Sequence, residues 1–477
     1  MPRPFRLALC TLALLLSPLA GAQAQGSFSS LPEMGDRSTT VLTTDTSEQI
    51  GRAMMKQLQR AGKLHQDPLI EDYIQRLGRD LAAAGMVGEQ TFHFFVVNER
   101  SINAFAMPGG YIGVHAGLIL ASHTESELAA VIAHEIAHVT QHHIARSVEK
   151  AKQMNLPLTA AVIAAILLGA ADPEMGNAAL AASLGVSSQM QIDFTRANEK
   201  EADRVGMQLL ASAGFEPRGM ADFFLRLQQD SRFASDSVPD FLRTHPVSTE
   251  RMAEAQERAS RYPPIQRADS ISYQLIRARL LAQHHPADTL RAQLQQNDSR
   301  LRLDGESRDY LRALLHQQAR EHQQAASLFE QLLQQAPERI AYVDGMGQLE
   351  IERSRFIQAT NRYREGLEYY PGNEILTLGL SQALMAEGKH TQAKRELQRL
   401  LNRASSSIRA TRMLAQVEAE LGNTAASHIA LAEYYLLLDE PHSAREQLQT
   451  ARRQHPLDEY HAARIDARME QVERLLK

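Results

Sequence analysis

The sequence has no tryptophan, and aromatic residues make up only 5% of its 477 residues. It also has no excess of positive charge, because 51 lysines and arginines stand against 56 aspartates and glutamates. A nucleic-acid-binding protein typically uses a basic surface to contact phosphates and aromatic rings to stack on bases. We therefore expect no nucleic acid among the partners of this chain.

Cysteine is almost absent as well, since Cys10 is the only one. It lies in an N-terminal segment with the pattern of a secretory signal peptide. Two arginines come first, then an apolar run over Leu7–Ala20, then the small-residue cleavage site Ala22-Gln23-Ala24. We expect residues 1–24 to be removed, which would leave no cysteine for a disulfide bond. An exported protein of this size without disulfides is typical of the bacterial periplasm.

No apolar run reaches the roughly 20 residues that a membrane-spanning helix needs. The longest, Leu156–Ala171, has about 16 residues. We interpret it as a core helix or as a mobile flap near an active site, with peripheral membrane contact as the alternative. The chain is long enough for more than one domain. Residues 25–44, rich in serine, threonine and glycine, are predicted to be a flexible lead-in.

The most informative stretch is Leu128–Thr140, L-A-A-V-I-A-H-E-I-A-H-V-T. On a helix, His134 and His138 lie on the same face, close enough for both imidazoles to bind one metal ion. The neighbouring carboxylate of Glu135 is placed to act as a base on a metal-bound water. The five-residue pattern also occurs by chance in unrelated proteins, so a third ligand is needed to establish a metal site.

A candidate third ligand lies in the acidic segment Phe194–Gly206, F-T-R-A-N-E-K-E-A-D-R-V-G. Glu199 and Asp203 are four residues apart and share one helical face, whereas Glu201 points roughly the opposite way. That face therefore offers one carboxylate for a metal and a second that could hold the free N–H of a ligand histidine. A solvated acidic helix is the alternative interpretation.

Short strands are predicted before the metal helix, at Phe92–Val97 and Tyr111–Val114, separated by a Pro-Gly-Gly turn. A strand of small residues beside such a turn can bind an extended peptide by edge addition, so Asn103, Phe105, Gly110 and Tyr111 are candidate substrate-binding residues. An ordinary hairpin turn explains the same pattern.

From about Ser270 the sequence turns helical to its end. Ala325, Ala359 and Ala393 are spaced by 34, which is the tetratricopeptide period. The segments that start at these alanines align as the second helices of successive hairpins, and Ala444–Pro456 is interpreted as a further one. Because the step from Ala393 to Ala444 is 51, we expect an irregular array there or an extra helix near Leu414–Leu421. Such an array stacks into a solenoid with a concave groove that binds protein segments, or it serves only as a spacer.

Four motifs stand in the order known from the M48 zinc metallopeptidases and cover roughly residues 45–262: N-A-F-A-M-P-G-G-Y-I, H-E-I-A-H, N-E-K-E-A-D and T-H-P-V-S-T-E-R-M. The chain resembles this family. The resemblance implies one zinc ion per chain, held by His134, His138 and Glu199, with Glu135 as the catalytic base. It also selects Glu199 over Glu201, because the family ligand is the first acid of E-x-x-A-D.

The resemblance extends to three further residues. His245 matches a histidine that approaches the zinc in periplasmic relatives, which implies a gating ligand or a transition-state stabiliser; a loop histidine ordered by Pro246 is the alternative. Arg251 matches a basic position that would pair with the acidic site. His142 and His143 are not placed to join the ligands, so we interpret them as surface or second-layer residues.

We therefore expect a mainly α protein with a small β-sheet: a zincin-like metallopeptidase domain over 45–265, then an α-solenoid of tetratricopeptide repeats over 270–477. The periplasmic M48 peptidases with such arrays imply a role in assembling outer-membrane β-barrel proteins and in degrading stalled ones. The implied partners are the barrel-assembly machinery and its clients, including the lipopolysaccharide-assembly barrel. The alternative function is a chaperone or scaffold whose metal site is largely silent. The sequence leaves the oligomeric state open.

Overall fold

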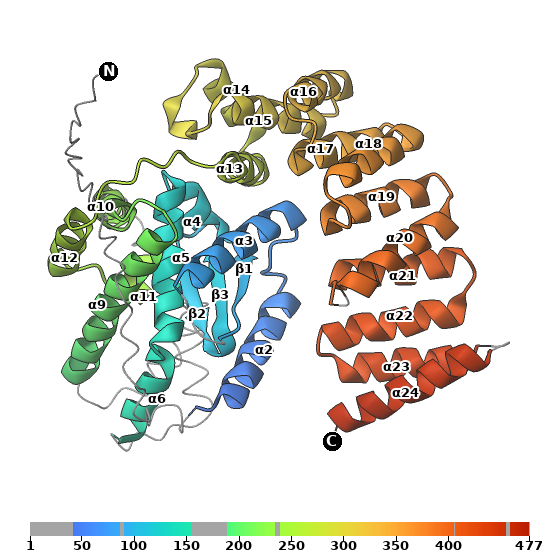
Figure 1. Ribbon diagram of the computed structural model, residues 1–477, viewed down its shortest axis with the longest axis horizontal. Coiled ribbons are helices and arrows are strands. Elements are labelled where there is room, and N and C mark those ends of the chain that lie inside the picture. The colour runs from blue at the N-terminus through green and yellow to red at the C-terminus, as the bar shows by residue number, and fades with distance from the viewer. Residues whose placement is uncertain are drawn as a thin grey trace, which may run out of the picture.

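The computed structural model describes residues 42–85, 90–153, 188–233, 239–404, 406–454 and 458–476. The predicted signal peptide, most of the predicted lead-in and the apolar segment Leu156–Ala171 lie outside these ranges. Within them, we find no helix whose length and apolar character would let it cross a bilayer. The fold is mainly helical with one small sheet, as predicted. It consists of the half with the peptidase-like motifs, residues 42–260 (the metallopeptidase half), and a curved helical array, residues 271–475 (Figure 1).

Two amphipathic helices open the first half, α2 (Thr44–Arg60) and α3 (Pro68–Ala84). Each starts at a capping side chain, because Thr43 accepts a hydrogen bond from the backbone of Thr46 and Asp67 accepts one from Leu69. Pro68 occupies the first turn of α3, where its missing N–H has no helical partner to lose.

The sheet has three strands, β1 (His93–Val97), β2 (Ala104–Met107) and β3 (Tyr111–His115), in the order β1-β3-β2. β3 runs parallel to β1 and antiparallel to β2. A short 3₁₀ turn, Pro108–Gly110, connects β2 to β3, and Gly109 and Gly110 both take positive φ angles there. The hairpin interpretation of this stretch is therefore confirmed, and β2 lies at an edge of the sheet.

Helix α5 (Glu125–Thr140) lies at the centre of the metallopeptidase half (Figure 1). It packs against α9 (Ser188–Ser212), and a Cβ at Gly206 would lie about 3.0 Å from the His134 backbone, so glycine favours this close approach. The remaining helices of this half surround the pair: α4 (Ala116–Ala121), α6 (His143–Gln153), α10 (Arg218–Phe233), α11 (Asp240–Thr244) and α12 (Thr249–Ser260).

The array consists of successive helix pairs. They are α13 (Ile271–His284) with α14 (Ala287–Gln295), α15 (Gly305–Gln318) with α16 (His322–Gln335), α17 (Ile340–Glu352) with α18 (Phe356–Tyr369), α19 (Glu374–Ala386) with α20 (His390–Arg403), α21 (Ile408–Glu420) with α22 (Thr424–Leu437), and α23 (Pro441–Arg452) with α24 (Glu459–Leu475). A single 3₁₀ turn, Ser299–Leu301, lies between α14 and α15.

The prediction of an irregular array after Ala393 is wrong. Helices α16, α18, α20 and α22 start at residues 322, 356, 390 and 424, in uniform steps of 34. The small-residue position of α22 is Ser427, whose hydroxyl donates to the Ala415 carbonyl at 2.8 Å. Ala444 belongs instead to α23, the first helix of the last pair. The spacing of alanines alone predicted the wrong repeat register, because Ser427 fills the packing position that alanine occupies in the other repeats.

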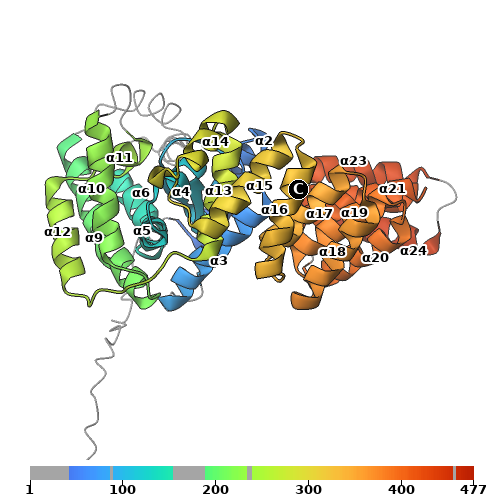
Figure 2. The same ribbon diagram turned by 90° about the horizontal axis from the view of Figure 1, so that it is seen from above.

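The array contacts the metallopeptidase half at two places. Near its start, Arg279 pairs with Asp67 at 2.6 Å, and Ser270 bonds to Glu125, which begins the central helix α5. Further along, Arg409 pairs with Glu71 at 2.6 Å, and the turn before α23 contacts the end of α2 through Lys56 and Arg60. Seen from above, the array extends from one side of the metallopeptidase half (Figure 2).

Candidate metal centre

Helix α5 carries three of the predicted site residues deep inside the protein. Thr124 caps its start, and every residue from Glu125 to Ala137 is buried. His134 and Glu135 are each 1% exposed, and the His138 side chain is 12% exposed. Because unpaired polar groups are costly in such a place, these side chains require partners or a bound ion.

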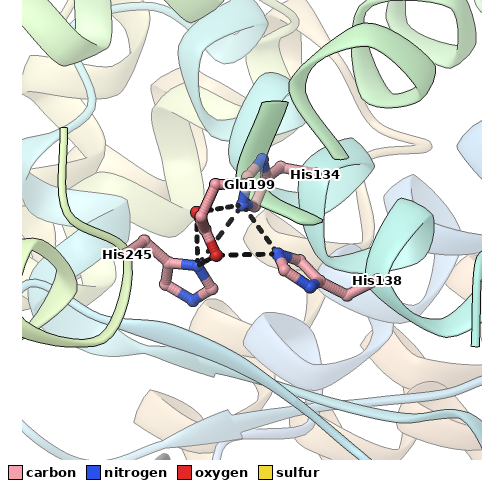
Figure 3. Close-up of side chains that lie close together, drawn as sticks. All are labelled: His134, His138, Glu199 and His245. Atoms are coloured by element: carbon pink, nitrogen blue, oxygen red, sulfur yellow. Dashed lines mark hydrogen bonds and ion pairs between the residues drawn. The ribbon is translucent and has the colours of Figure 1, made fainter. Parts of the chain in front are cut away.

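Four potential ligands converge from three separate elements (Figure 3). Nε2 of His134 lies 3.0 Å from Nε2 of His138 and 3.4 Å from the carboxylate of Glu199, which comes from α9. His245, at the end of α11, places Nδ1 3.1 Å from both Glu199 oxygens. One ligand atom of each residue lies within 4.8 Å of all the others, so this cluster can hold one metal ion.

A buried cation holds the acidic side of the cluster. Arg251, from α12, is 2% exposed and forms a two-pronged pair with Asp203 at 2.7 and 2.8 Å. The same guanidinium contacts Glu199 at 2.8 Å. Burial alone would raise the pKa of Glu199, but the neighbouring His245 and His134 hold that pKa well below its usual range. The predicted pairing of Arg251 with the acidic site is present.

Asp203 lies behind His134, on the side away from the cluster. Its carboxylate is 3.0 Å from Nδ1 of His134, so the two nitrogens of this ring face a carboxylate and the ligand cluster respectively. This arrangement orients a ligand imidazole and fixes which nitrogen is free to bind a metal. The pKa of Asp203 is lowered despite burial, because His134 and Arg251 both bond to its charged form.

The donor set fits a divalent transition metal, since imidazoles and a carboxylate are its usual ligands. Glu135 adds an independent sign of catalytic use, because its Oε1 is buried and has no hydrogen-bond partner. Burial raises the pKa of this carboxyl, which suits a general base. Glu135 and His245 line one cleft together with Phe105 and Ala106 of the edge strand β2.

The loop that carries His245 is fixed by contacts on two sides. The ring of His245 stacks on Phe241, with centroids 4.9 Å apart, and the Phe241 amide donates to Ile102 just before β2. On the other side, Arg251 donates to the carbonyl of Pro246 at 2.9 Å. The guanidinium that holds Glu199 and Asp203 thus also holds this loop next to them.

Of the residues predicted to form a substrate-binding strand, those of β2 lie at an edge of the sheet. Tyr111 begins β3, which is paired with β1 on one side and β2 on the other, so its backbone is not free to bind a peptide. Asn103 and Phe105 are almost fully buried, and the Asn103 carbonyl accepts from the backbone of His115 at the end of β3. Gly110 lines a second cleft that also reaches His138.

Two histidines follow the motif. His142 is partly exposed, whereas His143 is only 3% exposed and lies against His138, so His143 is a second-layer residue, one of the two predicted alternatives. Glu201 does point away from Glu199, as predicted, but it faces His143 rather than open solvent. The sequence contains no obvious signal for this pairing, because it depends on a bend at His142.

Comparison with known proteins agrees with this geometry. Residues 68–259 match peptidase family M48, and residues 350–417 match the tetratricopeptide repeat. Over 98% of its length the chain is 36% identical to a putative β-barrel assembly-enhancing protease of Vibrio cholerae serotype O1, of which it covers 97%. The chain belongs to peptidase family M48.

Two proteins of Escherichia coli strain K12 support this M48 assignment. The β-barrel assembly-enhancing protease is 33% identical over 97% of this chain and 95% of its own length. The metalloprotease LoiP is 32% identical over 40% of this chain and 73% of its own length. This M48 protein is therefore a metalloendopeptidase with a tetratricopeptide array, and its metal is expected at the cluster on α5.

Proposed function

We propose that this protein is a periplasmic zinc metalloendopeptidase that promotes assembly of outer-membrane β-barrel proteins and degrades those that stall. The observation that carries the proposal is the cluster of His134, His138 and Glu199 beside Glu135, whose buried Oε1 has no hydrogen bond. Full-length similarity to proteins named for barrel assembly supports the biological context. The N-terminal segment with its signal-peptide pattern supports export.

The proposed chemistry assigns a role to each residue. His134, His138 and Glu199 would hold one zinc ion, which, when bound, would activate a water molecule and polarise the scissile carbonyl. Glu135 takes a proton from the attacking water at Oε1 and delivers it to the leaving amine nitrogen. Asp203 keeps Nδ1 of His134 protonated, and Arg251 offsets the negative charge of Asp203 and Glu199.

The substrate would lie extended along the free edge of β2. The cleft at the metal cluster includes Phe105 and Ala106, and the neighbouring cleft continues along Met107 to Gly110. Backbone pairing at a sheet edge recognises an extended chain without requiring a particular sequence. Such recognition suits a protease whose substrates are unfolded or stalled proteins.

The decisive experiment is Glu135→Gln. This variant should bind zinc like the parent protein, but cleavage of an unfolded barrel protein should fall by about 10²- to 10⁴-fold. Glu257→Gln is the matched control, because the Glu257 side chain is 61% exposed and should leave cleavage unchanged. Undiminished cleavage by Glu135→Gln would refute the assigned base.

His245 is proposed to gate the site. Its Nδ1 lies within the ligand cluster, where it can take the position that a water would need. His245→Ala should therefore raise proteolysis of an unfolded substrate in the purified protein. Lower activity would assign His245 to transition-state stabilisation instead, and unchanged activity would assign it a purely structural role.

The array is proposed to dock the barrel-assembly machinery or its clients, including the lipopolysaccharide-assembly barrel. An open groove lies between its inner helices and the start of α3. Gln348, Gln382 and Gln416 line it at intervals of 34, one for each repeat. Each amide offers a donor and an acceptor, so the row can bind the backbone of an extended segment.

This docking surface can be tested with the groove glutamines. Replacing Gln382 and Gln416 together with alanine should weaken co-purification with the barrel-assembly machinery or its clients while leaving zinc content unchanged. Gln358→Ala, on the exposed face of α18, is the control. Undiminished co-purification would show that the partners bind elsewhere.

One observation favours a second candidate function, a chaperone or scaffold whose metal site is largely silent. His245 already lies within the ligand cluster, so the resting protein can be held inactive. In that case Glu135→Gln would still restore outer-membrane assembly in a deletion strain, whereas removal of residues 270–477 would not. Failure of Glu135→Gln to restore assembly would favour the protease.

A further inference from the structure

A second imidazole lies behind His138, on the side away from the ligand cluster. Nε2 of His138 faces the cluster, and its other ring nitrogen, Nδ1, is 2.9 Å from Nδ1 of His143. The two rings meet edge to face, with centroids 4.8 Å apart. Because His143 is 3% exposed, water has little access to this contact.

The contact continues into a chain of hydrogen bonds. Nε2 of His143 lies 3.3 Å from Oε2 of Glu201, and the same oxygen accepts from Arg146 at 2.8 Å. If His138 binds a metal through Nε2, its proton is on Nδ1 and is donated to Nδ1 of His143. The proton of His143 is then on Nε2 and is donated to Glu201. Every donor along this chain meets an acceptor.

The backbone is bent in a way that creates the contact. In a continuous helix, residues five apart point about 140° away from each other, because each residue turns the chain by about 100°. Helix α5 ends at Thr140, His142 takes a left-handed φ of 53°, and α6 starts at His143. This turn places the His143 ring against the His138 ring. Non-glycine residues adopt this conformation only at some cost, so the turn needs compensating contacts.

We propose that His143 is a positioning residue for the metal, acting through His138 by way of the chain His138–His143–Glu201–Arg146. The second ligand imidazole, His134, is oriented directly by Asp203, which in turn is held by Arg251. The carboxylates that support the two histidines are Asp203 and Glu201. Both lie on α9, which also supplies the proposed ligand Glu199. The inference rests on the proposed role of His138 as a ligand.

Zinc affinity of the full chain, measured by competition with a chelating dye, tests this role. His143→Leu removes the acceptor and should weaken zinc binding by about 10- to 100-fold. Asparagine has as many side-chain heavy atoms as leucine, and its Oδ1 can accept from Nδ1 of His138, so His143→Asn should recover most of the affinity. His142→Asn is the neighbouring control, because asparagine tolerates the left-handed turn, and it should bind zinc like the parent.

The comparison of Leu with Asn separates positioning from packing. Equal loss of affinity in both variants, or an affinity within about twofold of the parent in His143→Leu, would overturn the proposal. The melting temperature of each zinc-free variant measures the packing cost of the substitution separately from zinc affinity. If the parent binds no zinc, or if His138→Ala binds it normally, the proposed ligand set fails instead, which is a distinguishable result.

Discussion

The metal centre and the groove of the array are both lined by polar side chains, but they are built in opposite ways. At the metal centre, Arg251, Glu199 and Asp203 are at most 5% exposed, and Arg251 of α12 reaches the two carboxylates of α9. In the groove, Gln382 and Gln416 are exposed and repeat once per helix pair. The buried set is held by charge pairs between distant segments, whereas the exposed set inherits its spacing from the repeat.

This difference determines how each region responds to change. A buried ion network loses far more than one contact when a member is removed, because the remaining charges stay desolvated and unpaired. A repeat array distributes its stability over neighbouring interfaces, so a local defect has a local cost. Variants of matched chemistry in the two regions should therefore have very different effects.

The largest effect is expected for Arg251→Ala. The substitution leaves Glu199 and Asp203 buried without their cation, and in the metal-free protein it should cost about 3–5 kcal/mol in unfolding free energy of the metallopeptidase half. Zinc should restore part of this loss. Calorimetry with a chelator measures the loss of stability, and calorimetry with zinc measures how much of it is restored. Arg258→Ala, on the same helix but with a one-third exposed side chain, should change stability by less than about 1 kcal/mol.

Ala359→Leu should have an intermediate effect. Ala359 is 0% exposed, so the larger side chain overpacks the helix pair and should cost about 1–3 kcal/mol in stability of the array. Zinc affinity should remain that of the parent, which calorimetry and dye competition together can establish. Gln358→Leu adds a similar side chain on the exposed face and is the control. Loss of zinc binding in Ala359→Leu would contradict the independence of the two regions.

Ser427 tests the corrected repeat register. Ser427→Ala restores the residue found at the equivalent positions and gives up only the bond to Ala415, so stability should change by about 1 kcal/mol or less. Ser427→Leu should instead lower the stability of the array by about 1–3 kcal/mol, as expected for Ala359→Leu. Urea unfolding followed by circular dichroism suits both, because the protein has no tryptophan. A tolerated leucine at this position would argue against the regular array.

The smallest effect is expected for the distal contact between the halves. Arg409 and Glu71 form a partly exposed pair, so a double-mutant cycle with alanine should give a coupling of about 0.2–1 kcal/mol. The coupling should shrink in high salt. A coupling above that range, or one insensitive to salt, would mean that the two halves are joined as firmly here as at Arg279.

Much of the fold was readable because local patterns specify it. Three alanines at steps of 34 predicted the array, and its second helices α16, α18 and α20 follow that step. The register error arose at Ser427, where a different small residue meets the same packing need. The central place of β3 was also unreadable, because strand order depends on pairing between segments rather than on the strand itself.

The sequence by itself determined which polar residues share a helix face. The spacing of His134 and His138 on one helix, and of Glu199 and Asp203 on another, follows from helical geometry alone. The tertiary structure decided what surrounds them. It places His245 within the cluster and His143 against His138. It also pairs Arg251 with Glu199, Asp203 and the Pro246 carbonyl. The physical reason is that helical periodicity depends on residues close in the sequence, whereas a buried charge network forms only when distant segments fold together.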